Sequence, residues 1–192
     1  MYDEKQSALI DAAIRAVARD GLEKTTTRSI GSVAGINDAY IYRYFKDKED
    51  LLSRAYILVN EDLVSLLMHR IGEAGKMAIE YGRQRFAYVL RGLWDVLLEN
   101  RDICLFCDYY YHSASYQKYA ADAHHTLAIS LLDKMGERYT IAEQGEHALY
   151  YLMESIFGFA ARAVTDRYPK GEEGYDALVD RLYQIFCSFV TA

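Results

Sequence analysis

The sequence has little of what an extracellular, loop-rich or membrane-spanning protein needs. Pro169 is the one proline in 192 residues, which favours long helices over a loop-rich or all-β fold. The three cysteines are an odd number and too few for a disulfide scaffold. No run approaches the ~18 uninterrupted apolar residues of a membrane span, and the first residues lack the order of a signal peptide. We therefore expect a cytoplasmic protein with no membrane partner.

What the sequence does contain is typical of an ordinary globular protein. Hydrophobic residues make up 52% and charged residues 26%, which excludes a disordered chain. The length allows one or two domains with a sizeable core. Eighteen tyrosines is a high count, and a ring with a polar tip suits interfaces and ligand pockets.

Apolar residues recur at three- and four-residue spacings along the chain, which predicts an all-α fold. Gly72 and Gly75 are expected to break the pattern. The predicted helices span residues 3–19, 27–34, a short segment after residue 37, 48–70, 76–100, 102–112, 116–139, 143–168 and 175–190.

Residues 25–52 predict a helix-turn-helix followed by the start of another helix. Gly35 can close the first short helix in a left-handed conformation, and Asn37 can cap the next. A short helix with one buried face and small, aromatic and basic side chains on the other suits the DNA major groove. The outward side chains would include Asp38, Tyr40 and Arg43, and the inward ones are Ile30, Val33, Ala34, Ile36, Ile41 and Phe45.

This stretch resembles the DNA-binding domain of the TetR family of transcriptional repressors. The resemblance covers about the first quarter of the chain in detail, and the remainder resembles the family only in length and helical pattern. It is carried by Ala12-Ala13, Gly21, Thr25-Thr26, Ile30, Ala34-Gly35-Ile36, Ile41-Tyr42, Tyr44-Phe45, Lys48-Glu49 and Leu51-Leu52.

The resemblance implies an N-terminal three-helix helix-turn-helix domain, residues 1–50, joined to a larger helical domain for ligand binding and dimerisation, residues 51–192. Residues 24–48 carry five basic side chains against two acidic ones, in a protein of net charge −6, so a local positive surface could meet phosphate. Chance clustering on a solvated face is the alternative. The implied DNA-binding residues are Thr27, Arg28, Asn37, Asp38, Ala39, Tyr40, Tyr42, Arg43, Lys46 and Lys48.

Within this set the resemblance separates two roles. Thr27, Tyr42 and Lys48 would contact the DNA backbone, and Arg43 could form paired hydrogen bonds with a guanine. Asp38 departs from the family pattern, because a carboxylate near phosphates is repulsive unless it accepts from cytosine or pairs with a neighbour such as Arg43. Base preference therefore cannot be transferred from a relative.

The last two predicted helices are apolar over more than one face, and the resemblance implies that they form a homodimer. Burial within one subunit is the alternative. Aromatic side chains could line a pocket for an unidentified, flat or cationic small molecule, or could be core. The candidates are Tyr88, Trp94, Phe106, Tyr110, Tyr111, His112, Tyr116, His125, Tyr151 and Phe157.

Sequence signals of catalysis and of cofactors are missing. The chain has no phosphate-binding glycine loop, nucleophile elbow or H-E-x-x-H, so we expect neither an enzyme nor a cofactor. Cys104 and Cys107 form a C-x-x-C, which could hold a metal or be redox-active but is more typical of core packing.

The favoured hypothesis is a homodimeric regulator, a repressor released from a palindromic operator by a small-molecule ligand. A helical protein–protein adaptor without specific DNA binding is the alternative, and a small enzyme using the aromatic cavity is a third. The ligand, the operator, the regulated genes and the sign of regulation are left open by the sequence.

Overall fold

A computed structural model describes residues 4–76, 82–137, 140–143 and 145–191. Over these ranges the regular structure is helical except for one pair of two-residue strands, which confirms the all-α class. Asp3, Tyr81 and Tyr139 belong to predicted helices but lie outside the described residues.

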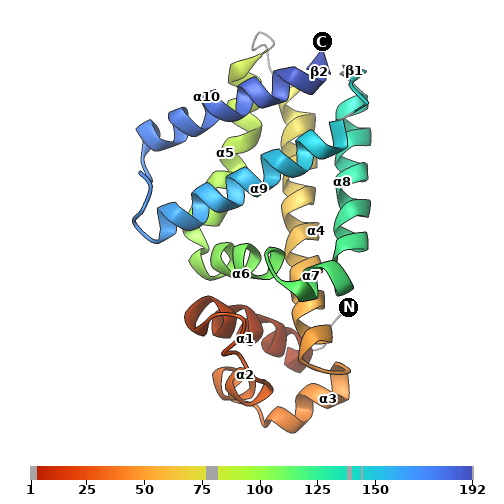
Figure 1. Ribbon diagram of the computed structural model, residues 1–192, viewed down its shortest axis with the longest axis vertical. Coiled ribbons are helices and arrows are strands. Elements are labelled where there is room, and N and C mark those ends of the chain that lie inside the picture. Colours follow the sequence, from red (N-terminus) through yellow and green to blue (C-terminus); the bar gives the residue numbers. More distant parts are fainter. Residues whose placement is uncertain (1–3, 77–81, 138–139, 144, 192) are drawn as a thin grey trace. The chain divides into compact units, whose positions relative to one another are not determined.

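Figure 1 labels the helices and strands in chain order. The helices are α1 Glu4–Asp20, α2 Thr27–Ala34, the 3-10 segment η1 Asp38–Tyr40, α3 Ile41–Tyr44, α4 Lys48–Ala74, α5 Arg83–Glu99, α6 Arg101–Tyr111, α7 Ala114–Tyr119, α8 Ala121–Gly136, α9 Gly145–Val164 and α10 Glu172–Phe189. Strand β1, Thr140–Ile141, pairs antiparallel with β2, Val190–Thr191.

Several predicted boundaries are wrong. Gly72 does not end α4, which continues to Ala74. The helix predicted over 116–139 is two helices that meet at Ala120. Helix α9 ends at Val164, before a left-handed Asp166 with φ of 59°.

Two starting points also differ from the prediction. Helix α5 begins at Arg83 and not at residue 76, and it follows Gly82 in a positive-φ conformation. Helix α10 begins at Glu172, three residues before the predicted start.

The chain forms two compact units. Unit 1 comprises residues 1–60 and 101–124, and unit 2 comprises residues 61–100 and 125–192. This division differs from a boundary at residue 50 because α6 packs against α1. The functional division of the chain at residue 50 stays a prediction.

Small side chains on α1 allow α6 to pack closely in unit 1. Ala12, Ala13 and Ala16 are fully buried on α1. Cys104 and Phe106 on α6 are also fully buried, and α1 and α6 are in contact. Apolar burial of this kind is the main stabilising term for such a helix pair.

In unit 2, helices α5, α9 and α10 contact one another pairwise, and Figure 1 shows α9 and α10 side by side. Their shared core contains Leu93, Leu97, Ile156, Ala160, Leu178, Val179 and Leu182. Of the helices in the described ranges, none combines the length and the apolar character needed to cross a membrane.

Candidate nucleic-acid interface and ligand cavity

Helix α2 begins at a capping box. The Thr26 hydroxyl oxygen accepts from the Ser29 backbone N–H at 3.1 Å, and the Ser29 hydroxyl oxygen accepts from the Thr26 N–H at 2.9 Å. The helix ends at Gly35, which has φ of 67° as the sequence predicts. These contacts satisfy backbone groups that an eight-residue helix would otherwise leave unpaired.

The turn between the two short helices lies directly against Gly31. The Ile36 N–H donates to the Gly31 carbonyl at 3.0 Å. A Cβ atom on Gly31 would lie 2.8 Å from the Ile36 carbonyl oxygen and 3.0 Å from the Asp38 nitrogen. The absence of a side chain on Gly31 therefore lets the turn approach α2 closely.

The second short helix begins in a tight form. Asn37 accepts from the Ala39 N–H through its side-chain oxygen at 2.9 Å, which confirms the predicted cap. One 3-10 turn, η1, then leads into the four-residue helix α3. The recognition segment is thus residues 38–44.

One face of this helix pair is buried and the other is open. Ile30, Ile41 and Phe45 are buried, as predicted from their spacing. Val33, Ala34 and Ile36 are only half-buried, so the inner surface is smaller than predicted. The exposed residues of the candidate set are Arg28, Asn37, Ala39, Tyr42, Arg43 and Lys46.

Tyr40 organises the basic groups around it. The guanidinium of Arg43 lies 5.2 Å from the centre of the Tyr40 ring, and the Lys5 ammonium lies 4.7 Å from it. These cation–π contacts limit the conformations of Arg43 before any DNA is bound. Tyr40 and Asp38 are half-buried, so neither is as outward-facing as the sequence predicts.

Lys48 and Asp50 fix the start of α4. The Lys48 ammonium donates to the Thr25 carbonyl at 3.2 Å. Thr27, two residues after Thr25, is half-buried. Burial would raise the pKa of Asp50, but hydrogen bonds from Arg54 and from the Lys46 N–H outweigh it and lower that pKa. The Asp47 carboxylate accepts from the Asp50 N–H at 2.8 Å and so caps the start of α4.

An aromatic cluster in unit 1 contains several predicted ligand-binding residues. The Tyr116 hydroxyl lies 2.9 Å from His124 Nδ1, and the Tyr56 and Tyr110 rings are 5.0 Å apart. Burial lowers the pKa of His124 to about 4, so the imidazole is neutral near pH 7. Phe106 stacks on Tyr110, with ring centres 5.9 Å apart. The cluster is a packed core with a neutral histidine in it.

Cys104 and Cys107 are part of the same core. Both are buried, and burial raises the pKa of the Cys104 thiol to about 12 and that of Cys107 further still. A thiolate is the metal ligand and the nucleophile, so these side chains are unreactive near neutral pH. Over the described ranges, no cluster of three or more histidine, cysteine or acidic residues could hold a metal ion.

The other predicted ligand-binding residues are dispersed. Trp94 is fully buried in unit 2 and packs against Tyr175, with ring centres 6.2 Å apart. His125 lies 2.9 Å from Glu146. The remaining members are Tyr88 beneath Arg70, Tyr111 against Tyr116, exposed His112, exposed Tyr151 and half-buried Phe157.

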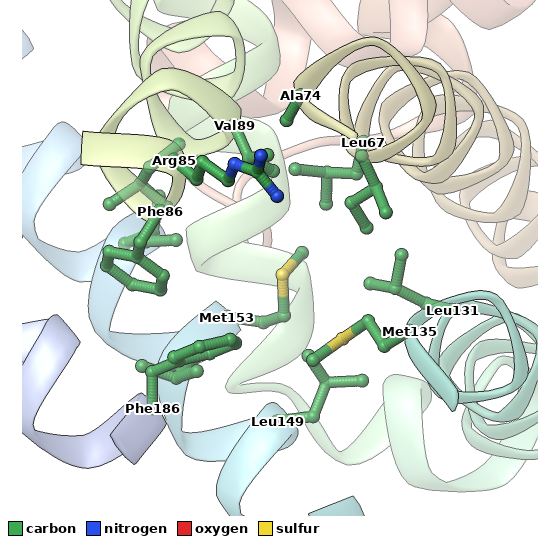
Figure 2. A pocket seen from close by; sticks show the side chains of 14 residues that line it. Leu67, Ala74, Arg85, Phe86, Val89, Leu131, Met135, Leu149, Met153 and Phe186 are labelled. Atoms are coloured by element: carbon green, nitrogen blue, oxygen red, sulfur yellow. The ribbon is translucent and has the colours of Figure 1, made fainter. Parts of the chain in front are cut away.

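A different set of residues encloses a cavity within unit 2. It holds about 730 Å³ of empty space, counting the part that opens to solvent. Figure 2 shows aliphatic and thioether side chains around it, with Arg85 directed inward. The lining residues are Leu67, Ile71, Ala74, Arg85, Phe86, Val89, Leu90, Leu131, Met135, Leu149, Leu152, Met153, Ile156 and Phe186.

None of the ten aromatic and histidine candidates lines this cavity. Sequence reasoning missed it because leucine and methionine at helical spacing look the same around a void as in a packed core. Arg85 gave no signal either, because it follows Arg83 and Gln84 in the polar first turn of α5.

The capped helix pair, its tight turn and its exposed basic face define a helix-turn-helix DNA-binding protein. Residues 9–55 match the family model described as bacterial regulatory proteins, tetR family. This part of the chain is therefore similar to the DNA-binding domain of TetR-family transcriptional regulators.

Two further proteins are similar to this chain over most of its length. The uncharacterised HTH-type transcriptional regulator YvkB of Bacillus subtilis is 26% identical over 153 residues, 79% of this chain and 78% of that protein. A TetR family regulator structure from Marinobacter aquaeolei covers 98% of this chain and 96% of its own, with TM-score 0.75 and 19% identity.

The fold also resembles the regulator FadR of Bacillus subtilis, solved in complex with stearoyl-CoA. That match covers 92% of this chain and 97% of the other, with TM-score 0.69 and 17% identity. At this identity the likeness concerns the fold alone.

Proposed function

We propose that this DNA-binding regulator is a repressor that binds a palindromic operator as a homodimer and is released by a small molecule. Residues 1–50 would bind DNA, and residues 51–192 would bind the ligand and form the dimer through α9 and α10. The observation that carries the DNA-binding part is the exposed basic and aromatic face of residues 28–46, opposite buried Ile30, Ile41 and Phe45.

Two kinds of DNA contact are proposed within this face. Thr27, Tyr42 and Lys48 would contact phosphates, which position the protein without reading sequence. Arg28, Asn37, Ala39, Tyr40 and Arg43 would read base edges, with Asp38 and Lys46 beside them. The Tyr40 ring supports this assignment because it holds Arg43 in a restricted position.

Control by a ligand is proposed to act through the cavity of unit 2. Concave sites with mostly apolar walls commonly hold small molecules. A ligand that favours the state unable to bind DNA, with a coupling of about 1–3 kcal/mol, would reduce operator affinity roughly 5- to 150-fold.

Selection of bound sequences from a random DNA pool tests the proposal. We expect a two-fold symmetric sequence whose affinity falls linearly with salt on logarithmic axes. Arg43→Ala should relax preference at one or two positions, at a cost of about 1–3 kcal/mol. Lys48→Ala should weaken binding to all sequences alike.

Equal retention of all DNA by the wild-type protein would instead favour the adaptor. A uniform loss of affinity in Arg43→Ala, with the selected sequence unchanged, would remove Arg43 from the base-reading set.

A further inference from the structure

Lys5 contacts the recognition segment although it belongs to α1 and not to the helix-turn-helix. Its ammonium lies 4.7 Å from the centre of the Tyr40 ring. The guanidinium of Arg43 lies 5.2 Å from the centre of the same ring. One aromatic side chain therefore gathers a cation from the start of α1 and a cation from α3.

The register of α1 explains why Lys5 points toward Tyr40. Leu9 and Ala12 follow Lys5 by four and seven residues, so the three residues share one side of the helix. Leu9 and Ala12 are fully buried, whereas Lys5 is exposed. The stem of Lys5 thus starts from the buried side of α1, and its ammonium reaches the surface at the Tyr40 ring.

The contact with Tyr40 leaves the positive charge of Lys5 in place. A carboxylate would neutralise an ammonium, whereas an aromatic ring attracts it through a quadrupole and has no net charge. At an exposed site this attraction is weak. It can orient the ammonium without preventing a phosphate oxygen from bonding it.

We propose that Lys5 binds a DNA phosphate from outside the helix-turn-helix, and that Tyr40 is the residue that positions it. This inference rests on the proposed DNA-binding role of residues 28–46 and adds α1 to that surface. An ammonium contacts phosphate as a point charge, which raises affinity for any sequence and carries no base information. Tyr40 would then place a sequence-independent contact beside Arg43, the proposed reader of bases.

Salt-dependent DNA binding by the full chain tests the phosphate contact. The probes are the operator selected from the random pool and a random duplex of equal length, and fluorescence anisotropy measures affinity over a range of KCl concentrations. Each phosphate contact that is lost reduces the slope of log affinity against log salt by about 0.9. We expect Lys5→Met to reduce the slope by about this amount per subunit and to weaken both duplexes by the same factor. Lys5→Arg should keep the wild-type slope.

Lys118→Met is the matched control. The Lys118 ammonium also lies 4.7 Å from the centre of a tyrosine ring, that of Tyr119, but it belongs to α7, outside the helix-turn-helix. Removal of this charge should leave the slope unchanged. Both lysines are exposed, so both variants should keep the helix content of the wild type by circular dichroism.

A double-mutant cycle tests the positioning role of Tyr40. Tyr40→Phe keeps the ring, so Lys5→Met should weaken binding by the same factor in this background as in the wild type. Tyr40→Leu removes the ring, and the lysine change should then weaken binding by a smaller factor, because an unrestrained ammonium loses more freedom when it binds. Equal factors in all three backgrounds would overturn the role of Tyr40.

An unchanged salt slope in Lys5→Met, with a wild type that selects an operator, would overturn the phosphate contact alone. A slope that falls equally in Lys5→Met and Lys118→Met would also overturn it, because the loss would then reflect net charge. A wild type that binds random DNA with a Lys5-dependent slope but selects no operator would instead count against the proposed function alone.

Discussion

Gly31 determines how closely the turn packs against α2. A Cβ atom added to Gly31 would lie 3.0 Å or less from two backbone atoms of the turn. The turn would have to move to make room for it. The residues that follow this turn include Asn37, whose side chain caps the recognition segment. A change at Gly31 would therefore reach the DNA-binding face through the backbone.

We expect Gly31→Ala to destabilise the protein by about 1–3 kcal/mol, as overpacking does. A loss of stability would be diagnostic of the close contact, because alanine within a helix is otherwise more stable than glycine by about 1 kcal/mol. Urea unfolding measures the change. Ser32→Ala, on the exposed side of the same helix, is the control, and a Gly31→Ala protein as stable as that control would contradict the close approach.

His124 should make stability depend on pH. Its pKa of about 4 in the folded state is below the ordinary value of about 6.5, so the unfolded chain takes up a proton first as pH falls. Stability from this residue is complete above about pH 6.5 and declines toward pH 4, by up to about 3 kcal/mol.

His124→Gln can still accept a hydrogen bond from Tyr116 but does not titrate. The difference in unfolding free energy between wild type and this variant should therefore change between pH 7 and pH 4.5. Parallel pH profiles for the two proteins would show that the imidazole is not kept neutral by burial. Denaturant melts at the two pH values provide the measurement.

At the scale of elements, Arg70 connects α4 to α5 within unit 2. Its Nε and Nη2 donate to the Tyr88 carbonyl at 3.0 Å and 2.5 Å, and its guanidinium lies 4.1 Å from the centre of the Tyr88 ring. The side chain passes over Gly92, where a Cβ would lie 2.3 Å from its Cδ. Gly92 thus leaves the space that the arginine occupies.

We predict that Gly92→Ala displaces Arg70 and costs about 1–3 kcal/mol, despite the better helix propensity of alanine. In the Arg70→Met background the same change should cost less, because the contact is already gone. A double-mutant cycle by thermal unfolding measures the difference. Additive effects would mean that Gly92 and Arg70 act independently.

The sequence predicts best those elements whose ends have a chemical cause. Thr27–Ala34 is correct at both ends, since Gly35 closes the helix in a left-handed conformation, and the Asn37 cap is also correct. Gly72 misled the prediction because an interior glycine costs a helix only about 1 kcal/mol, which packing can override. The helix break at Ala120 has no glycine or proline to reveal it.

The DNA-binding face is more predictable from the sequence than the cavity is. Exposed Arg43 follows from the local helical pattern, whereas the cavity depends on which helices meet in unit 2. Aromatic residues suggested a pocket, but Trp94 and Tyr110 are fully buried core residues. No local pattern distinguishes a leucine that faces a void from one that faces another leucine.

At the scale of the whole molecule, the proposed dimer through α9 and α10 can be tested without disturbing the core. Tyr151 on α9 is 58% exposed, and a Cβ added at Gly158 on the same helix would meet nothing within 4 Å. Gly158→Glu should fold normally as a subunit and yet place a charge where a partner helix would approach.

Sedimentation at micromolar concentration should show the wild type as a dimer and Gly158→Glu as mainly monomer. Gly72→Glu is the matched control, because Gly72 is also within a helix and has open space at its Cβ. Circular dichroism should show equal helix content in both variants. Persistence of the dimer in Gly158→Glu would place the interface elsewhere.

The hollow interior of unit 2 also has a consequence for how long the protein survives in a cell. A ligand that binds this cavity in the folded protein but not in the unfolded chain would stabilise the fold by mass action. Because proteases degrade transiently unfolded chains, occupancy should lengthen the half-life of the regulator. A compound that releases the regulator from its operator would then also raise the concentration of the regulator. More regulator would compete for the operator, so expression of the regulated gene would reach its plateau at a lower level than ligand binding alone predicts.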